Sequence, residues 1–307
     1  MTDIRRSPAA DSRTDSRKRQ KAAGFALMLA ALLIFPVKAG ALELSLSGGA
    51  GNAGFTADGD FPSGIRPAFS LGIQSDISDN LSAGFFVRQD TLSGRTVAAE
   101  FSYTGGFLTL TAGPVFGLLN GSGEKTGQPL LLQPGLRLGI SMFFLDCITL
   151  EASSDICLRT ATEDTGGQMY PAQARLAAGV AFPFILCSLA ASQKSAEVPG
   201  DGGYRQIRTD YGLYTRVFGK NSPFRFDVNF IYREMDFSAP GDTGRRETEI
   251  RTLVIGGGVE FCITRFTFFL NGEGSLYTLS AKQDGGKLDT GNPFLYDIQA
   301  GVRILFR

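Results

Sequence analysis

The chain has 307 residues, in which 30 lysines and arginines balance 30 aspartates and glutamates, and it contains no histidine. Without histidine the chain lacks the usual base near neutral pH and a common zinc ligand, which excludes histidine-dependent catalysis and argues against an ordinary zinc site. Beyond residue 41 the chain holds 22 basic and 27 acidic residues, a net charge of −5, which argues against nucleic acid as a partner.

The first 41 residues have the layout of a secretory signal peptide. A positive cluster comes first and consists of Arg17, Lys18, Arg19 and Lys21. An apolar run over 22–37 follows, and small residues then offer a cleavage site at Ala39 and Ala41. The alternative is an uncleaved membrane helix, but the run is shorter than the roughly 20 residues that a span requires. We predict an N-terminal extension and cleavable leader over 1–41, Sec-dependent export, and one domain over 42–307.

Most of the chain beyond the leader alternates apolar and polar residues with a period of two. The clearest repeat covers 224–233, where Phe, Phe, Val, Phe and Tyr alternate with Arg, Asp, Asn, Ile and Arg. This period places the two sets on opposite faces of a β-strand, one suited to lipid and the other to water. Similar repeats over 81–88, 148–159, 172–184 and 207–217 predict an all-β chain.

A soluble β-sandwich also alternates, but three features favour a membrane barrel. The predicted strands are long, phenylalanines gather beside the short turns, and tight and long connections alternate. Lipid cannot satisfy an open sheet edge, so such strands close on themselves. We predict a transmembrane antiparallel β-barrel with up-and-down meander topology and fourteen strands. Twelve is the alternative, because the strands over 94–104 and 185–193 are the weakest.

The longer connections are rich in Gly, Asp, Thr and Pro and are expected to face outward: 57–65, 119–131, 160–171, 194–205, 238–248 and 281–291. An inward fold of one of them stays open as an alternative. Arg251 and Glu260 cannot both face the lumen of an uninterrupted strand, which predicts a bulge or a rim position near Gly256.

Four cysteines, Cys147, Cys157, Cys187 and Cys262, allow two disulfides in an exported protein. Cys187 shares the apolar face of its strand, however, whereas Cys157 shares the polar face of another. Because no two of them obviously stand at matching height on adjacent strands, we predict free thiols.

The last predicted strand, 294–306, carries a motif of its own. Gln299, Gly301, Ile304 and Phe306 follow the order polar, any, Gly, two of any, apolar, any, aromatic. This pattern resembles the C-terminal assembly signal of bacterial outer-membrane β-barrels, although the chain adds Arg307. The resemblance implies location in the bacterial outer membrane, with membrane lipid and the barrel-assembly machinery as partners.

The phase of this last strand assigns the residues that face the barrel interior. The predicted lumen-lining set is Arg88, Arg137, Glu151, Asp155, Arg159, Arg175, Arg208, Asp210, Arg216, Arg225, Asp227, Arg233, Glu273, Asp297 and Arg303. Arginine leads in this set, and guanidinium groups favour anions. The leading hypothesis is a passive pore for small polar solutes with a preference for anions. As a general class it resembles the fourteen-stranded monomeric porins and, less closely, the twelve-stranded porins for acidic oligosaccharides.

Other functions remain open at the level of sequence. Arg and Asp on neighbouring strands could pair and fill the lumen. The barrel could be a non-conducting surface scaffold or adhesin displaying loops such as 204–207 and 237–247, or a transporter of hydrophobic solutes. Glu151 and Asp155 could form an acid–base pair, but solvated carboxylates are the favoured interpretation. We therefore predict no enzymatic activity and no cofactor.

Overall fold

The computed structural model describes residues 41–56, 59–92, 94–119, 131–157, 170–198, 203–219, 222–241 and 244–306. These residues belong to the second of two units, Met1–Gly40 and Ala41–Arg307. The leader with Ala39, along with Arg159 and Arg307, lies outside the described residues. No helix in these ranges is long and apolar enough to cross a bilayer.

The described residues form fifteen strands. They are β1 (Leu42–Gly51), β2 (Arg66–Ser78), β3 (Leu81–Asp90), β4 (Gly94–Gly105), β5 (Leu108–Leu119), β6 (Leu131–Phe144), β7 (Ile148–Cys157), β8 (Tyr170–Phe182), β9 (Ile185–Val198), β10 (Tyr204–Phe218), β11 (Phe224–Gly241), β12 (Gly244–Ile263), β13 (Phe266–Gln283), β14 (Gly286–Lys287) and β15 (Tyr296–Phe306).

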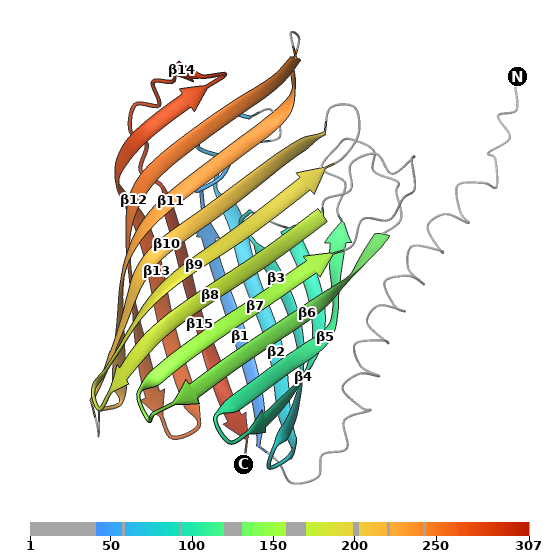
Figure 1. Ribbon diagram of the computed structural model, residues 1–307, viewed down its shortest axis with the longest axis vertical. Coiled ribbons are helices and arrows are strands. Elements are labelled where there is room, and N and C mark those ends of the chain that lie inside the picture. The colour runs from blue at the N-terminus through green and yellow to red at the C-terminus, as the bar shows by residue number, and fades with distance from the viewer. Residues whose placement is uncertain are drawn as a thin grey trace, which may run out of the picture. The chain divides into compact units, whose positions relative to one another are not determined.

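The strands form a closed antiparallel meander. Each of β1 to β13 pairs with the next, and β15 lies between β13 and β1, which closes the ring (Figure 1). The two-residue β14 pairs only with β13 and is not part of the wall. The wall therefore has fourteen strands, as predicted, and the twelve-strand alternative is wrong. The two weakest predictions are present as β4 and β9.

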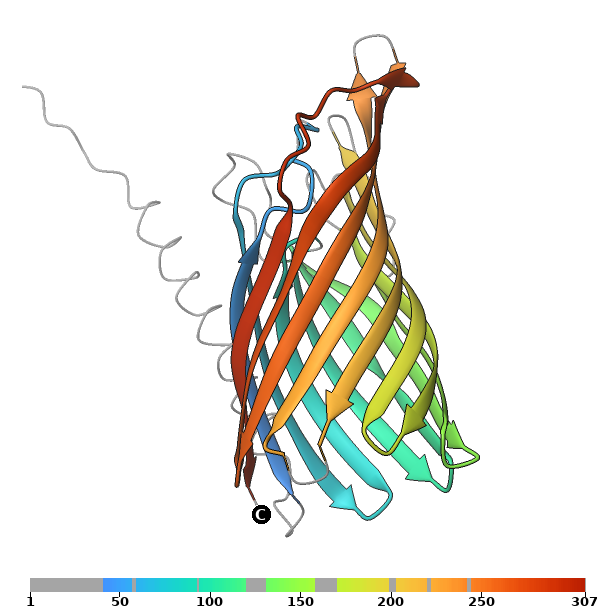
Figure 2. The ribbon, with the colours of Figure 1, turned by 90° about the vertical axis from the view of Figure 1, so that its left-hand side faces the viewer.

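The two ends of the barrel differ. At one end, here called the turn end, short connections such as 106–107 and 183–184 join the strands, and β1 begins and β15 ends there. Gly106 and Thr264 take the positive φ that such tight turns need. The opposite end, here called the loop end, carries the segment between β1 and β2 and the residues between β13 and β15 (Figure 2).

Two of the predicted long loops are largely strand. β9 continues to Val198 and β10 begins at Tyr204, so little of 194–205 is loop. β11 and β12 pair as far as Gly241 and Gly244, so the expected loop over 238–248 is also mostly a hairpin. Here the alternation continues beyond the length needed to span lipid, and cross-strand pairing overrides the local turn composition.

The phase conflict between Arg251 and Glu260 is resolved because Arg251 faces outward, and β12 itself has no bulge. β12 keeps one phase, with Glu260 facing the lumen and Arg251 on the outer face beside Glu234 and Glu249. The irregularities predicted near Gly256 lie instead in β13, where the pairing register shifts opposite Arg251/Thr252 and Leu253/Val254. Extra residues on β13 absorb the offset as bulges.

The outer wall is apolar. Large hydrophobic side chains stand exposed on neighbouring strands, including Leu138, Leu176, Leu189, Phe226, Phe230 and Leu270. An apolar surface that extends around a closed barrel suits lipid rather than water. The alternating pattern of the sequence thus separates a lipid-facing wall from a polar interior.

Candidate functional site: the barrel lumen

The lumen contains a cavity of about 870 Å³ lined by polar side chains from most of the wall strands. Ten predicted residues line it: Arg88, Glu151, Asp155, Arg175, Arg208, Arg216, Asp227, Glu273, Asp297 and Arg303. Four others, Arg137, Asp210, Arg225 and Arg233, form ion pairs with residues of the lining. The lumen of the described chain therefore divides into three charged clusters and one apolar cluster.

The first charged cluster surrounds Glu260 toward the turn end. Arg303 binds Glu260 directly, while nitrogens of Arg225 and Arg216 lie 3.5 and 3.8 Å from its carboxylate oxygens. Arg216 also makes a bidentate contact with Asp227, at 2.7 and 3.1 Å. The side chains of Arg216 and Arg225 are 41% and 48% exposed, so water reaches this part of the lumen.

The second cluster lies along β4, β6, β7 and β8. Arg137 donates two hydrogen bonds to Asp155, at 2.7 and 2.6 Å, and one to Glu100 at 2.8 Å. Gln173 donates a further bond to Asp155 at 2.6 Å. Both carboxylate oxygens of Asp155 therefore accept hydrogen bonds from these neighbours. Among the described residues no hydrogen bond joins Asp155 to Glu151, so no contact supports an acid–base pair between them.

Two arginines of the lining face aromatic rings instead of carboxylates. The guanidinium carbon of Arg88 lies 5.2 Å from the ring centre of Phe86, and that of Arg175 lies 5.1 Å from the ring centre of Tyr214. Among the described residues, neither makes an ion pair. Cation–π contact stabilises a guanidinium without neutralising its charge. Arg88 and Arg175 therefore keep a positive charge that a solute can meet.

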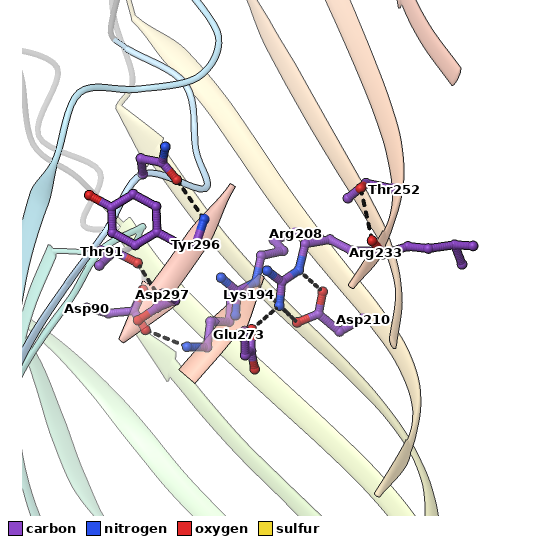
Figure 3. A network of polar contacts seen from close by, with 12 residues as sticks. Asp90, Thr91, Lys194, Arg208, Asp210, Arg233, Thr252, Glu273, Tyr296 and Asp297 are labelled. Carbon is purple, nitrogen blue, oxygen red and sulfur yellow. Dashed lines mark hydrogen bonds and ion pairs between the residues drawn. The ribbon is translucent and has the colours of Figure 1, made fainter. Parts of the chain in front are cut away.

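The third charged cluster crosses the lumen nearer the loop end (Figure 3). Arg233 binds Asp210 at 2.7 and 3.0 Å and Glu273 at 2.6 Å, and its side chain is only 2% exposed. Lys194 on β9 binds Asp90 on β3, six strands away in a ring of fourteen. Because these strands lie almost opposite each other, the Asp90–Lys194 pair spans the interior.

An apolar cluster lies beyond this layer, at the loop end. Its buried members are Ala53, Phe55, Tyr204, Met235, Phe237, Ile250, Ala281 and Leu295, with Phe61 packed against them. Phe55 and Phe61 belong to the segment between β1 and β2, whereas Phe237 projects from β11. One predicted loop therefore folds inward, the alternative that the sequence left open.

These positions bear on the scaffold hypothesis. Tyr204 and Phe237, which begin two of the loops proposed to display a binding surface, are 7% and 2% exposed. Both belong to the apolar cluster inside the barrel. The part of that hypothesis that placed them on exposed loops is wrong.

Several residues of the lumen are missing from the predicted lumen-lining set. Lys194 falls within the predicted loop 194–205, and Phe269 is not in the predicted lumen set, although it lines the cavity with the Arg303 guanidinium 5.7 Å from its ring centre. A signal for the apolar cluster was present. Met235 and Phe237 lie on the lumen-facing side of β11, where most of the earlier positions are polar. Apolar side chains at these positions indicate that another part of the chain covers them.

The C-terminal motif occupies β15. Gln299 faces the lumen and donates a hydrogen bond to Ser47 at 2.6 Å, and Phe306 stands exposed on the wall. A Cβ at Gly301 would overlap the ring of Phe269 and the side chain of Ser47. Glycine is thus needed here for packing, whatever the motif does during assembly.

Fold and site together define a class of protein: a membrane β-barrel with an apolar outer wall and a charged lumen that contains a cavity. No protein-family model matches the sequence, and no curated protein matches it.

Solved structures of outer-membrane barrels are similar to the chain at low identity. A bacterial polysaccharide outer membrane secretin is 12% identical over 87% of this chain and 98% of its own, with a TM-score of 0.49. An outer membrane channel from Pseudomonas putida F1 is 9% identical over 87% and 95%, with a TM-score of 0.46. An anion-selective porin from Comamonas acidovorans is 13% identical over 86% and 98%, with a TM-score of 0.38. Similarity at this level carries no argument about function.

Proposed function

We propose that the chain is a passive pore of the bacterial outer membrane for small polar solutes, with the turn end in the periplasm. The observation that carries the proposal is the polar cavity inside a closed barrel whose outer wall suits lipid. The resemblance of the C-terminal motif to an assembly signal supports the location. A hydrophobic-solute transporter is less well supported, because the cavity is charged and the apolar cluster at the loop end is packed.

The proposed preference for anions rests on Arg88 and Arg175. The other described arginines of the lumen form ion pairs with carboxylates, which cancels most of their influence on a passing ion. Arg88 and Arg175 keep their charge beside aromatic rings. Glu151 and Asp297 of the same lining also make no ion pair among the described residues and oppose this charge. The preference for anions is therefore expected to be modest and to be lost without Arg88 and Arg175.

Planar-bilayer recording tests the proposal on protein purified from membranes after expression of the full chain. We expect discrete conductance steps, and a reversal potential in a salt gradient that favours anions. The double variant Arg88→Gln with Arg175→Gln should lose this preference, whereas Arg251→Gln, on the outer face, should keep it. Absence of steps in both the wild type and a variant with Phe55 and Phe61 replaced by Ala would refute the pore. A wild-type preference for cations would refute only the anion selectivity.

A further inference from the structure

The segment between β1 and β2, of which 52–56 and 59–65 are described, enters the loop end of the lumen with these residues. Phe55 is 1% exposed, and its ring centre lies 5.3 Å from that of Phe237 on β11 and 5.1 Å from that of Phe61. Tyr204 on β10 packs against the other side of Phe237, with ring centres 5.8 Å apart. In the ring of fourteen strands, β10 and β11 lie well across the barrel from β1 and β2. The described part of the segment therefore reaches across the loop end of the interior, to strands four to six positions away in the ring.

Internal contacts make the described part of this segment a compact unit. The amide of Ser63 donates to the carbonyl of Gly54 at 2.7 Å, and its hydroxyl donates to the carbonyl of Asn52 at 3.2 Å. Thr56 and Asp60 are joined by a backbone bond of 3.0 Å and a side-chain bond of 2.9 Å. Arg66, at the start of β2, donates to the carbonyl of Phe55. The bonds of Ser63 and of Thr56 with Asp60 move with the segment. The bond from Arg66 on β2 and the bonds of Asn52 to the chain at Tyr296 tether its base to the wall, so withdrawal pivots there and breaks the Arg66 bond.

Attachment to the far wall is mainly apolar. Among the described residues, one hydrogen bond joins the segment to β10, from the amide of Phe55 to Oε1 of Gln206 at a long 3.4 Å. The remaining contacts are those of the aromatic rings with the apolar cluster. Apolar contacts do not depend on direction, so they tolerate a small displacement of the segment. A ladder of hydrogen bonds would lose its bonds under the same displacement.

The closed arrangement also leaves polar atoms unsatisfied beneath the segment. Nε2 of Gln206 and Oγ1 of Thr248 are buried and have no hydrogen-bond partner among the described residues. Both side chains lie at the level of Phe237, because Phe237 pairs with Gln206 on β10 and with Thr248 on β12. A buried polar group without a partner costs stability, and water entering with the segment withdrawn would restore its bonds. Closure is therefore opposed locally by two groups that opening would satisfy.

We propose that the described residues of this segment, 52–56 and 59–65, form a gate that closes the loop end of the pore and opens it by withdrawing from the apolar cluster. This inference rests on the proposed pore function and adds its regulation. Opening separates Phe55 and Phe61 from Phe237 and exposes Gln206 to water. The Asp90–Lys194 pair below forms a second barrier, which solvating water weakens once the apolar seal is gone.

A reversible lock tests the gate. In a background with the four native cysteines replaced by Ser or Ala, Gly54→Cys and Gln206→Cys place thiols on the segment and on β10, at positions in van der Waals reach of each other. A short bis-methanethiosulfonate linker joins them, and dithiothreitol releases them. The matched control joins Thr104→Cys to Thr109→Cys at the turn end, where the native hydroxyls lie 3.1 Å apart.

We expect the link between the thiols introduced at positions 54 and 206 to abolish the conductance steps, and reduction to restore them. The linked control pair should conduct as before. Replacing Phe55 and Phe61 with Ala should increase the time spent open. Unchanged steps in the linked protein would overturn the gate and leave the pore standing. If no form conducts, including the reduced protein and the Phe55/Phe61 variant, the pore itself is refuted.

Discussion

Two ion pairs between the same strands, β10 and β11, show how the two ends of the lumen differ. Near the loop end, Nε of Arg233 lies 2.7 Å from Asp210, its direct cross-strand partner. Near the turn end, Nε of Arg216 lies 2.7 Å from Asp227, again its direct partner. The two contacts have the same geometry, but the Arg233 side chain is 2% exposed and that of Arg216 is 41% exposed.

The difference shows that burial, rather than pairing geometry, sets what each contact does. Arg233 also binds Glu273 and lies beneath the apolar cluster, so Glu273 depends on it for charge compensation, while Asp210 is shared between Arg233 and Arg208. Arg216 faces water, which can replace it. We infer that the loop end is a structural closure and the turn end a solvated vestibule.

Replacing Arg233 with Ala should have the largest effect on stability. It leaves Glu273, whose side chain is 27% exposed, without a cation and leaves Asp210 with Arg208 alone, at 3.2 Å, which is expected to cost about 3 kcal/mol of unfolding free energy. Arg216→Ala, the matched change at the turn end, should cost at most about 1 kcal/mol. Reversible urea unfolding in lipid vesicles measures both. Equal losses would remove the distinction between the two ends.

Truncating Phe237 should have a comparable effect. Phe237→Ala removes the ring that receives Phe55 and Tyr204 and should destabilise the barrel by about 3 kcal/mol. On the same strand, Phe226→Ala changes a ring that faces lipid, so less packing is lost and we expect about 1 kcal/mol. The same unfolding assay compares them. A larger loss for Phe226→Ala would show that the loop-end cluster is not packed as described.

A smaller effect is expected on the wall between the ends. Gly301→Ala forces a methyl group against Phe269 and Ser47 and should cost about 2 kcal/mol. Gly48→Ala, on the neighbouring strand, adds a methyl group to open space and should change stability by less than about 0.5 kcal/mol. If both variants unfold alike, Gly301 is not required for packing, and its place in the C-terminal motif needs another explanation.

The alternation of the sequence predicted the barrel, its strand number and the inward phase of residues such as Arg233, because strand periodicity is a local property. It did not predict the partners of those residues. The Asp90–Lys194 pair joins strands that are six apart in the ring. Such a contact depends on the register of all the strands and on the shape of the barrel, and neither can be read from the sequence of one strand.

The inward fold of 52–56 and 59–65 was open for a related reason. Its Gly, Asp and Pro residues indicate a loop. The place where its phenylalanines pack is indicated only by Met235, Phe237 and Ile250, which are apolar residues at lumen-facing positions. The two halves of that signal lie about 180 residues apart in the sequence, and they meet only when the barrel closes.

The accessibility of introduced thiols tests most directly whether the loop end is closed above a water-filled lumen. In the cysteine-free background, Ser188→Cys lies on the cavity lining and Met235→Cys lies in the apolar cluster, at 1% exposure in the native chain. A charged, water-soluble methanethiosulfonate reagent is added to each folded variant, and the reaction rate is measured. We expect rapid modification at position 188, which water reaches, and very slow modification at 235, which the apolar cluster covers. Equal rates, or faster reaction at 235, would contradict a closed loop end.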